Sequence, residues 1–231
     1  MKLLALDTSS LACSAAICAG DTVFERHEEL PREHTRLLMP MIRSLLEESA
    51  VGLPELDAIV LGNGPGSFIG MRIAASVAQG LAFGAAVEIA PVSSLAAIAA
   101  RAFQDPDVRE VAVAQDAHMN EVYLGLFGRG EGGLPSPLLA ERLQLIDVIP
   151  DLEPATANGR VAAGFGWQRY PDLLELNRDR VGGEAGILHP RARDLLGLGE
   201  SMVRAGKTVL PQDVVPAYLR QNVAEKPSGR P

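Results

Sequence analysis

The chain has 231 residues, enough for one large domain or two small lobes, and its 47% hydrophobic and 22% charged residues exclude an intrinsically disordered protein. A formal net charge of −8 argues against a protein that binds nucleic acid on its own, because such proteins usually carry a basic face. No apolar run approaches the length of a membrane span, and the two cysteines, Cys13 and Cys18, indicate a reduced, cytoplasmic protein.

The first hundred residues show alternating strand and helix patterns. We expect strands at 2–6, 12–19, 22–28, 58–61 and 87–92, and helices at 33–50, 67–83 and 93–103. Ser67 and Ser93 stand where the N-caps of the last two helices belong. A glycine-rich loop, "GNGPGSFIGMR" (62–72), joins the fourth strand to the second helix.

From residue 110 the opening pattern returns. "EVAVAQDAHMNEVYLGLFG" predicts strand, turn and strand, and its Asp116 falls on Asp7 when it is laid over "LLALDTSSLACSAAICAG". The weak identity leaves chance similarity of two hairpins as the alternative to a duplicated fold. Beyond it we expect a turn-rich segment at 129–137, a short helix at 145–152, a strand from 160 and a last helix over 191–206.

The glycine loop lacks the spacing of the common phosphate-binding loops. A Walker A loop places lysine and a hydroxyl residue after its last glycine, where Met71 and Arg72 stand, and the dinucleotide pattern needs glycine where Ile69 stands. We therefore interpret the loop as a tight turn in which Ser67 caps the next helix. Direct phosphate binding is the less favoured alternative.

Both early helices carry more apolar surface than one sheet covers. In 33–50 the apolar residues span an arc of about 200°, against roughly 100° for a helix with one buried face. This predicts a partner on the surplus face; burial between two layers of the same chain is the alternative. The helix at 67–83 has a second face with Phe68, Arg72 and Ser76, a mixture typical of a contact surface.

The histidines near the first helix lack the spacing of a metal site. His27 and His34 do not form a zinc motif, because Pro31 and Leu38 occupy the positions one helical turn on, so we expect no metal. No nucleophile arrangement is visible either, so we expect no catalytic residue.

Asp7, Thr8 and Ser9 follow the first strand as a similar turn does in actin-like ATPases. Those loops usually have glycine where Ser9 stands. A vestigial nucleotide loop is one interpretation, and a local Asx turn joining two strands is the other.

Four segments, taken together, resemble the TsaB (YeaZ) family over nearly the whole chain. They are "LALDTSSLACSAAI", "PREHTRLLMPMI", "GPGSFIGMRIAASVAQGLAFG" and "DAHMNEVY", followed by "YLRQNVA" at 218–224. The resemblance implies an α/β, actin-like (ASKHA) fold of two RNase H-like lobes, each a mixed sheet flanked by helices, with the second reduced. We expect lobes at 1–105 and 106–224 and a flexible tail at 225–231.

The resemblance also implies a non-catalytic subunit in the synthesis of threonylcarbamoyladenosine beside the tRNA anticodon. It implies a TsaD-like catalytic partner, a TsaE-like ATPase, and contact with tRNA only through the complex. No cofactor is expected on this chain alone, with ATP, ADP or threonylcarbamoyl-adenylate bound only within the complex. The rival hypothesis is a small actin-like ATPase or kinase that uses Asp7 and the glycine loop.

In this family the first two helices form the pairing surface, which also permits a homodimer. The residues expected in that surface are His34, Leu38, Met41, Ile42, Leu45, Phe68, Ile69, Arg72, Ala75, Ser76 and Gln79. Ile69 departs from the threonine common in the family loop. Leu38→Glu and Ala75→Glu are expected to break the complex without unfolding the chain.

Overall fold

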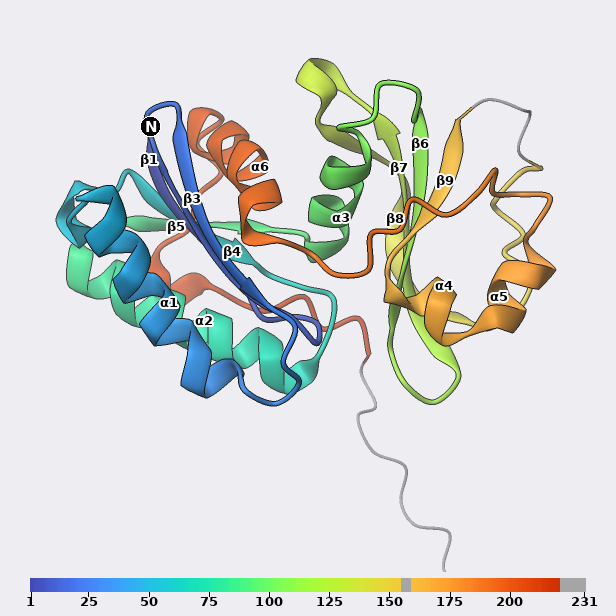
Figure 1. The fold of residues 1–231 in the computed structure, drawn as a ribbon, viewed down its shortest axis with the longest axis horizontal. Coiled ribbons are helices and arrows are strands. Elements are labelled where there is room, and N and C mark those ends of the chain that lie inside the picture. The colour runs from blue at the N-terminus through green and yellow to red at the C-terminus, as the bar shows by residue number, and fades with distance from the viewer. Residues whose placement is uncertain (155–158, 221–231) are drawn as a thin grey trace, which may run out of the picture.

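A computed structural model describes residues 1–154 and 159–220. The tail at 225–231, and residues 221–224 of the "YLRQNVA" segment, lie outside this range. Figure 1 shows two β-sheets side by side, each flanked by helices.

The first sheet combines a meander with a parallel extension. Its strands are β1 (Lys2–Asp7), β2 (Cys13–Ala19), β3 (Thr22–Glu28), β4 (Ala58–Gly62) and β5 (Glu88–Val92). Their order is β3-β2-β1-β4-β5, with β1, β2 and β3 antiparallel and β4 and β5 parallel to β1. All of these strands were expected, with bounds that differ by a residue or so.

The second sheet repeats this order without the fifth strand. Its strands are β6 (Glu110–Asp116), β7 (Glu121–Arg129), β8 (Pro135–Leu145) and β9 (Arg160–Ala163), in the order β8-β7-β6-β9. Again the first three are antiparallel and the last is parallel to the first. Asp7 and Asp116 each end the first strand of their sheet. The predicted duplication is therefore present, with a reduced second copy.

Helices cover both faces of the first sheet. α1 (His34–Ser49) and α2 (Phe68–Ala85) pack on one face, and α6 (Ala192–Arg204) packs on the other. The small residues Ala5, Ala16 and Ala90 line the α6 face. Gly199 of α6 lies so close to the sheet that a Cβ there would come within 2.3 Å of Val60. Small side chains on both partners allow this close packing.

The second sheet lies between α3 (Ser94–Ala102) on one face and α4 (Phe165–Arg169) with α5 (Pro171–Leu176) on the other. α3 and α6 pack together between the two sheets (Figure 1). The strands of the first sheet lie within residues 2–92 and those of the second within residues 110–163, but α6 comes from the second half of the chain and packs on the first sheet. A single cut at residue 105 therefore does not describe the helices.

The second half differs most from expectation. Residues 145–152 are not a helix, because the Ile149 N–H is held at 2.8 Å by the side chain of Asn177 and Pro150 follows it. The turn-rich segment expected at 129–137 contains the start of the 11-residue strand β8, which was not predicted. β8 is an edge strand, where proline is tolerated because one row of its N–H groups has no ladder partner.

Within the described residues, α2 alone has the length and apolar composition to cross a membrane. Its buried residues, including Ala74, Ala78 and Ala82, instead form part of the core against the first sheet. Such composition is common in a core helix of this kind.

Candidate functional site

The carboxylate of Asp7 is fully buried and accepts hydrogen bonds on both oxygens. The N–H and the hydroxyl of Ser9 each donate to Oδ1 at 2.8 Å, and the Ser94 hydroxyl donates to Oδ2 at 2.6 Å. The hydrogen bond from the Ser9 amide to Asp7, two residues earlier, forms an Asx turn, which is one of the two interpretations of this segment given above. Thr8 is also buried and donates to the Gly70 carbonyl at 2.6 Å. Of the predicted nucleotide loop, only Ser9 lines a cavity.

Burial raises the pKa of Asp7 to about 6, although the hydrogen bonds from Ser94 and Ser9 oppose the shift. A raised folded-state pKa means that this group stabilises the fold most fully below its usual pKa of 3.8, and that the contribution is lost as pH rises through 6. Asp7→Asn removes this dependence. We expect the stability of the variant relative to wild type to improve by up to about 3 kcal/mol between pH 4 and pH 7.

Urea unfolding at both pH values measures this difference. An equal offset between variant and wild type at pH 4 and pH 7 would show that Asp7 keeps an ordinary pKa in the folded protein.

The glycines of the loop allow it to dock on the Asp7–Ser9 turn. A Cβ at Gly66 would lie 2.2 Å from the Ser9 carbonyl oxygen, and one at Gly70 would lie 1.9 Å from that of Thr8. The N–H of Ser67 donates to the Ser9 carbonyl at 2.6 Å, and the Ser67 hydroxyl caps α2 by accepting from Gly70 N–H at 3.2 Å. The structure thus gives the glycines a packing role, and the predicted N-cap is confirmed.

Gly70→Ala should therefore destabilise the protein by about 2 kcal/mol or more, because backbone must move to admit the methyl group. Gly80→Ala in the same helix is the matched control, since nothing lies within 4 Å of its added Cβ. It should be neutral or stabilise by up to about 1 kcal/mol, because alanine is the better helix former. Chemical denaturation of both variants measures the contrast, and equal stabilities would contradict the packing role.

Asp116 holds a similar turn in the second lobe but is partly exposed. Its Oδ1 accepts from His118 N–H and from the Tyr170 hydroxyl, both at 2.8 Å. Burial and the neighbouring Asp116 raise the pKa of Tyr170 to about 12. His118, Met119 and Asn120 then follow with φ of 60°, 54° and 57°. Three consecutive left-handed residues without glycine are energetically costly, so the surrounding contacts must hold this loop.

A cavity of about 870 Å³ lies between these two turns, at the boundary of the lobes. Ser9, Gly66 and Phe68 line it from the first lobe, and Asp116 and Met119 from the second. Sequence patterns did not indicate the contributions of Tyr218 and Arg220, which reach this cavity from the end of the described chain.

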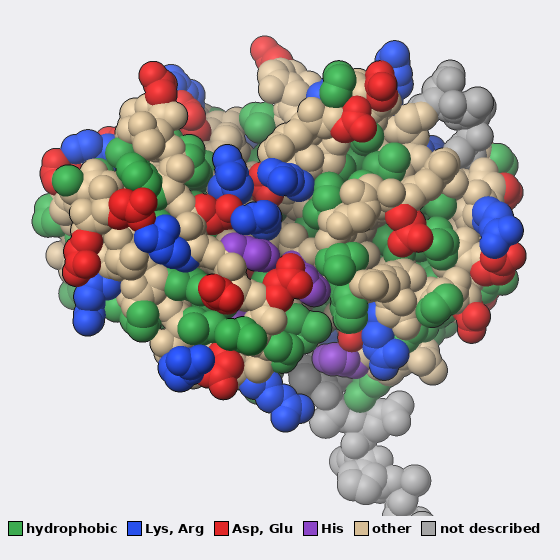
Figure 2. Space-filling model, in the orientation of Figure 1, with side chains coloured by type: hydrophobic (Ala, Val, Ile, Leu, Met, Phe, Trp, Pro, Cys, Tyr) green, Lys and Arg blue, Asp and Glu red, His purple; other side chains and the backbone are tan. Residues whose placement is uncertain are grey.

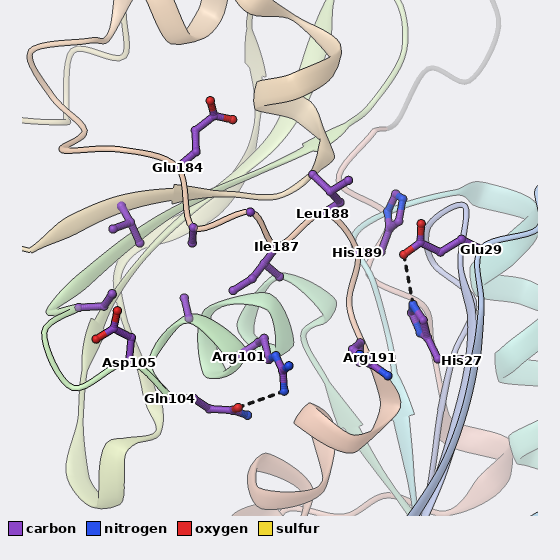
Figure 3. A pocket seen from close by; sticks show the side chains of 15 residues that line it. His27, Glu29, Arg101, Gln104, Asp105, Glu184, Ile187, Leu188, His189 and Arg191 are labelled. Atoms are coloured by element: carbon purple, nitrogen blue, oxygen red, sulfur yellow. Dashed lines mark hydrogen bonds and ion pairs between the residues drawn. The ribbon is translucent and has the colours of Figure 1, made fainter.

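A second cavity, of about 770 Å³, opens at the same boundary (Figure 3). On its first-lobe side His27 Nε2 lies 3.5 Å from Glu29 Oε1, and Arg101 of α3 donates a hydrogen bond at 3.0 Å to the side chain of Gln104, just beyond the end of that helix. His189 lines both cavities, and burial lowers the pKa of its imidazole. Figure 2 shows histidines along this boundary.

No metal-binding cluster of three or more His, Cys, Asp or Glu is found in residues 1–154 and 159–220. His34 Nε2 lies 3.1 Å from the Ser10 carbonyl oxygen, and Leu38 is buried in the core.

The predicted pairing surface is divided by burial. Six of its residues lie inside the protein, with at most 8% of their surface exposed: His34, Leu38, Met41, Ile42, Leu45 and Ala75. Much of the surplus apolar arc of α1 is covered by the same chain, because α1 packs against α2 as well as the sheet, while Met39 stays exposed. Leu38→Glu and Ala75→Glu would place a charge in the core, so the expectation that they spare the fold is wrong.

Three others are engaged by the chain's own C-terminal segment. Phe68 stacks on Tyr218 with ring centroids 5.4 Å apart, Arg72 donates to the Tyr218 hydroxyl at 3.0 Å, and Gln79 donates to the Pro211 carbonyl at 2.8 Å. Ile69 and Ser76 remain exposed, Ile69 to 70%.

The exposed residues border a groove between α1 and α2, with a volume of about 520 Å³. Its lining residues are Thr35, Leu38, Met39, Ile69, Arg72, Ile73, Ser76 and Val77. Figure 2 shows hydrophobic side chains gathered at the lower left, where Figure 1 places these helices. Thr35 and Met39, missing from the predicted surface, lie one turn apart on α1; the register set by its start at His34 is the signal that would have found them.

Comparisons with known proteins agree on one family. Residues 27–133 match the family model for TsaD, tRNA N6-adenosine threonylcarbamoyltransferase. The tRNA threonylcarbamoyladenosine biosynthesis protein TsaB of Escherichia coli is 37% identical over 98% of this chain and 97% of its own length. The TsaB protein of Haemophilus influenzae is 34% identical over 98% of this chain and 96% of its own.

Solved structures agree. YeaZ from Pseudomonas aeruginosa superposes with a TM-score of 0.84 at 36% identity, covering 94% of this chain and 99% of that one. A P. aeruginosa protein described as uncharacterized, with similarity to peptidase YEAZ, gives 0.87 at 37% identity, covering 95% and 99%. With the repeated strand order, these matches confirm the two-lobed, actin-like α/β fold.

Proposed function

The chain belongs to the TsaB family of tRNA threonylcarbamoyladenosine biosynthesis proteins, and we propose from this that it is a non-catalytic, activating subunit that pairs with a TsaD-like transferase. The observation that carries the proposal is the exposed apolar groove between α1 and α2. A groove with Ile69 at 70% exposure is the kind of surface that partners cover.

The proposal of a non-catalytic role draws support from the buried turn. Asp7 is enclosed and bonded to Ser9 and Ser94, and the glycine loop packs on this turn through close backbone contacts. An ATPase or kinase that uses Asp7 would need that carboxylate in contact with its nucleotide or metal. Tight ATP binding by the isolated chain in calorimetry, abolished by Asp7→Ala, would favour the ATPase instead.

We propose the remaining assembly from what membership of this family implies. A TsaE-like ATPase binds the pair, and tRNA contacts this chain only within the complex. ATP, ADP or threonylcarbamoyl-adenylate also binds only in the complex. The same groove can pair two copies of this chain when the partner is absent. The site of action is the cytoplasm.

The test is co-purification with the TsaD-like protein of the same cell, followed by a tRNA modification assay with and without this chain. We expect a stoichiometric complex, modification only when both proteins are present, and no transferase activity from this chain alone. A TsaD-like protein that modifies tRNA equally well without it would contradict the activating role.

A further inference from the structure

The C-terminal segment 209–220 runs along the first lobe before it crosses to the second. Val209 pairs with Ile89 of β5, and their N–H and C=O groups bond at 2.8 and 2.9 Å. Gln79 of α2 holds the Pro211 carbonyl at 2.8 Å. Asn63 then donates to the Val215 carbonyl at 2.9 Å. The segment therefore follows α2 from its middle back towards its N-terminal turn.

At that turn the segment stacks on the proposed docking helix. The Tyr218 ring lies 5.4 Å from that of Phe68 and accepts a hydrogen bond from Arg72 at 3.0 Å through its hydroxyl. The Arg72 guanidinium lies over the Phe68 ring, 3.8 Å from its centroid. Aromatic stacking, a cation–π contact and a hydrogen bond thus join three side chains into one unit.

The next two residues belong to the second lobe. Leu219 packs against its core, in the cluster that contains Ala117 and Tyr123. Arg220 donates to the Ala117 carbonyl at 2.8 Å and forms an ion pair with Glu121, and both charged side chains are at most 20% exposed. Three consecutive residues therefore connect α2 to the second sheet.

Arg220 holds the ends of the left-handed loop His118–Asn120. Besides Ala117 and Glu121, which flank the loop, it lies 3.4 Å from the His118 carbonyl oxygen. This loop lines the 870 Å³ cavity opposite Ser9. Because its backbone is costly to maintain, a change in the contacts of Arg220 is expected to change the loop first.

We propose that Tyr218, Leu219 and Arg220 form a latch that couples docking on α2 to the loop at the mouth of the cavity between the lobes. The idea rests on the proposed docking surface. A partner that covers Ile69 and Arg72 limits the motion of the stacked side chains of Phe68, Arg72 and Tyr218. Because Tyr218 is then fixed more firmly, Arg220 is held more firmly against the loop. Docking thus closes this side of the cavity, and a ligand that needs a closed cavity binds better when the partner is present.

The latch is tested first in the full chain alone, by amide hydrogen exchange at residues 117–121. Tyr218→Ala should speed exchange there about two- to tenfold, because it removes the stack that positions Arg220. Tyr218→Phe keeps the ring and should change exchange less than about twofold. Arg204→Ala, which alters only an exposed pair with Glu200, is the control.

Unchanged exchange in Tyr218→Ala, or equal acceleration in Tyr218→Phe, would overturn the latch. Arg220→Met is the second variant, and it should accelerate exchange at the same amides more strongly than Tyr218→Ala. If Arg220→Met leaves these amides unchanged, Arg220 does not hold the loop and the latch is again overturned.

The coupling is tested with the TsaD-like partner. Partner binding should slow exchange at 117–121 in the wild type, and Tyr218→Ala should bind the partner yet lose the slowing. Slowing that persists in Tyr218→Ala would mean that the partner covers the loop directly, which overturns the latch. Failure of the wild type to bind refutes the proposed docking instead, and the exchange measured on the chain alone still decides whether the latch exists.

Discussion

Ile69→Glu is expected to weaken binding of the proposed TsaD-like partner about a hundredfold or more while leaving the fold intact. Ile69 is 70% exposed, so the new carboxylate is solvated in the free protein and costs little. Docking in the groove would remove that charge from water, and Arg72, the cation lining the same groove, is already engaged by Phe68 and Tyr218, so burial of the new carboxylate is unfavourable. Calorimetric titration measures the loss of affinity, and thermal unfolding checks the fold.

Leu145→Glu is the matched control. Leu145 ends strand β8 in the second lobe and is 61% exposed, so it receives the same change of charge at similar exposure but away from α1 and α2. It should bind the partner like the wild type. If Ile69→Glu also binds normally, the groove is not the docking surface.

The first lobe was predictable from sequence because its signals are local. Apolar runs of strand length alternate with helical patterns, and Ser67 and Ser93 mark two helix starts that the structure confirms as N-caps. The second lobe has weaker local signals. Pro135 and Pro137 indicated a turn, yet β8 accommodates both at the sheet edge, where missing N–H groups break no ladder.

The glycine loop and the pairing surface differ in how much of their structure a sequence pattern can predict. The spacing of the glycine loop predicted a tight turn, and the structure confirms close packing of Gly66 and Gly70 on the Asp7–Ser9 turn. The apolar arc of α1 could not show that α2 covers much of it, because that contact depends on how two helices pack. Leu38 and Ile42 were therefore placed on the surface although they are at most 1% exposed.

Contacts between distant residues were beyond any local pattern. Tyr218 meets Arg72 across 146 positions of sequence, and Arg220 meets Ala117 across 103. No periodicity or capping rule brings such residues together, because only the packing of the two lobes sets their positions. The contacts of Tyr218 and Arg220 are therefore visible only in three dimensions.

Leu38→Glu and Met39→Glu change adjacent residues of α1 but should affect the stability of the protein very differently. Leu38 is 1% exposed in the core of the first lobe, so its replacement buries an unpaired charge and removes apolar packing, at a cost of roughly 4 kcal/mol or more. That is a large part of the stability of a typical domain, and the variant should unfold or aggregate. Met39 is 37% exposed at the groove, so its replacement should change stability by no more than about 0.5 kcal/mol.

The two variants should also differ in the reason why they lose binding to the partner. Met39→Glu should fold and yet lose affinity for the proposed TsaD-like partner, because its charge lies at the groove, whereas Leu38→Glu should lose binding because the structure is lost. Urea unfolding followed by titration of the partner distinguishes the two causes. A well-folded Leu38→Glu would contradict the burial of this residue, and full binding by Met39→Glu would exclude the α1 side of the groove. Because consecutive residues of α1 lie in the core and at the surface here, neighbouring substitutions show which face the partner covers.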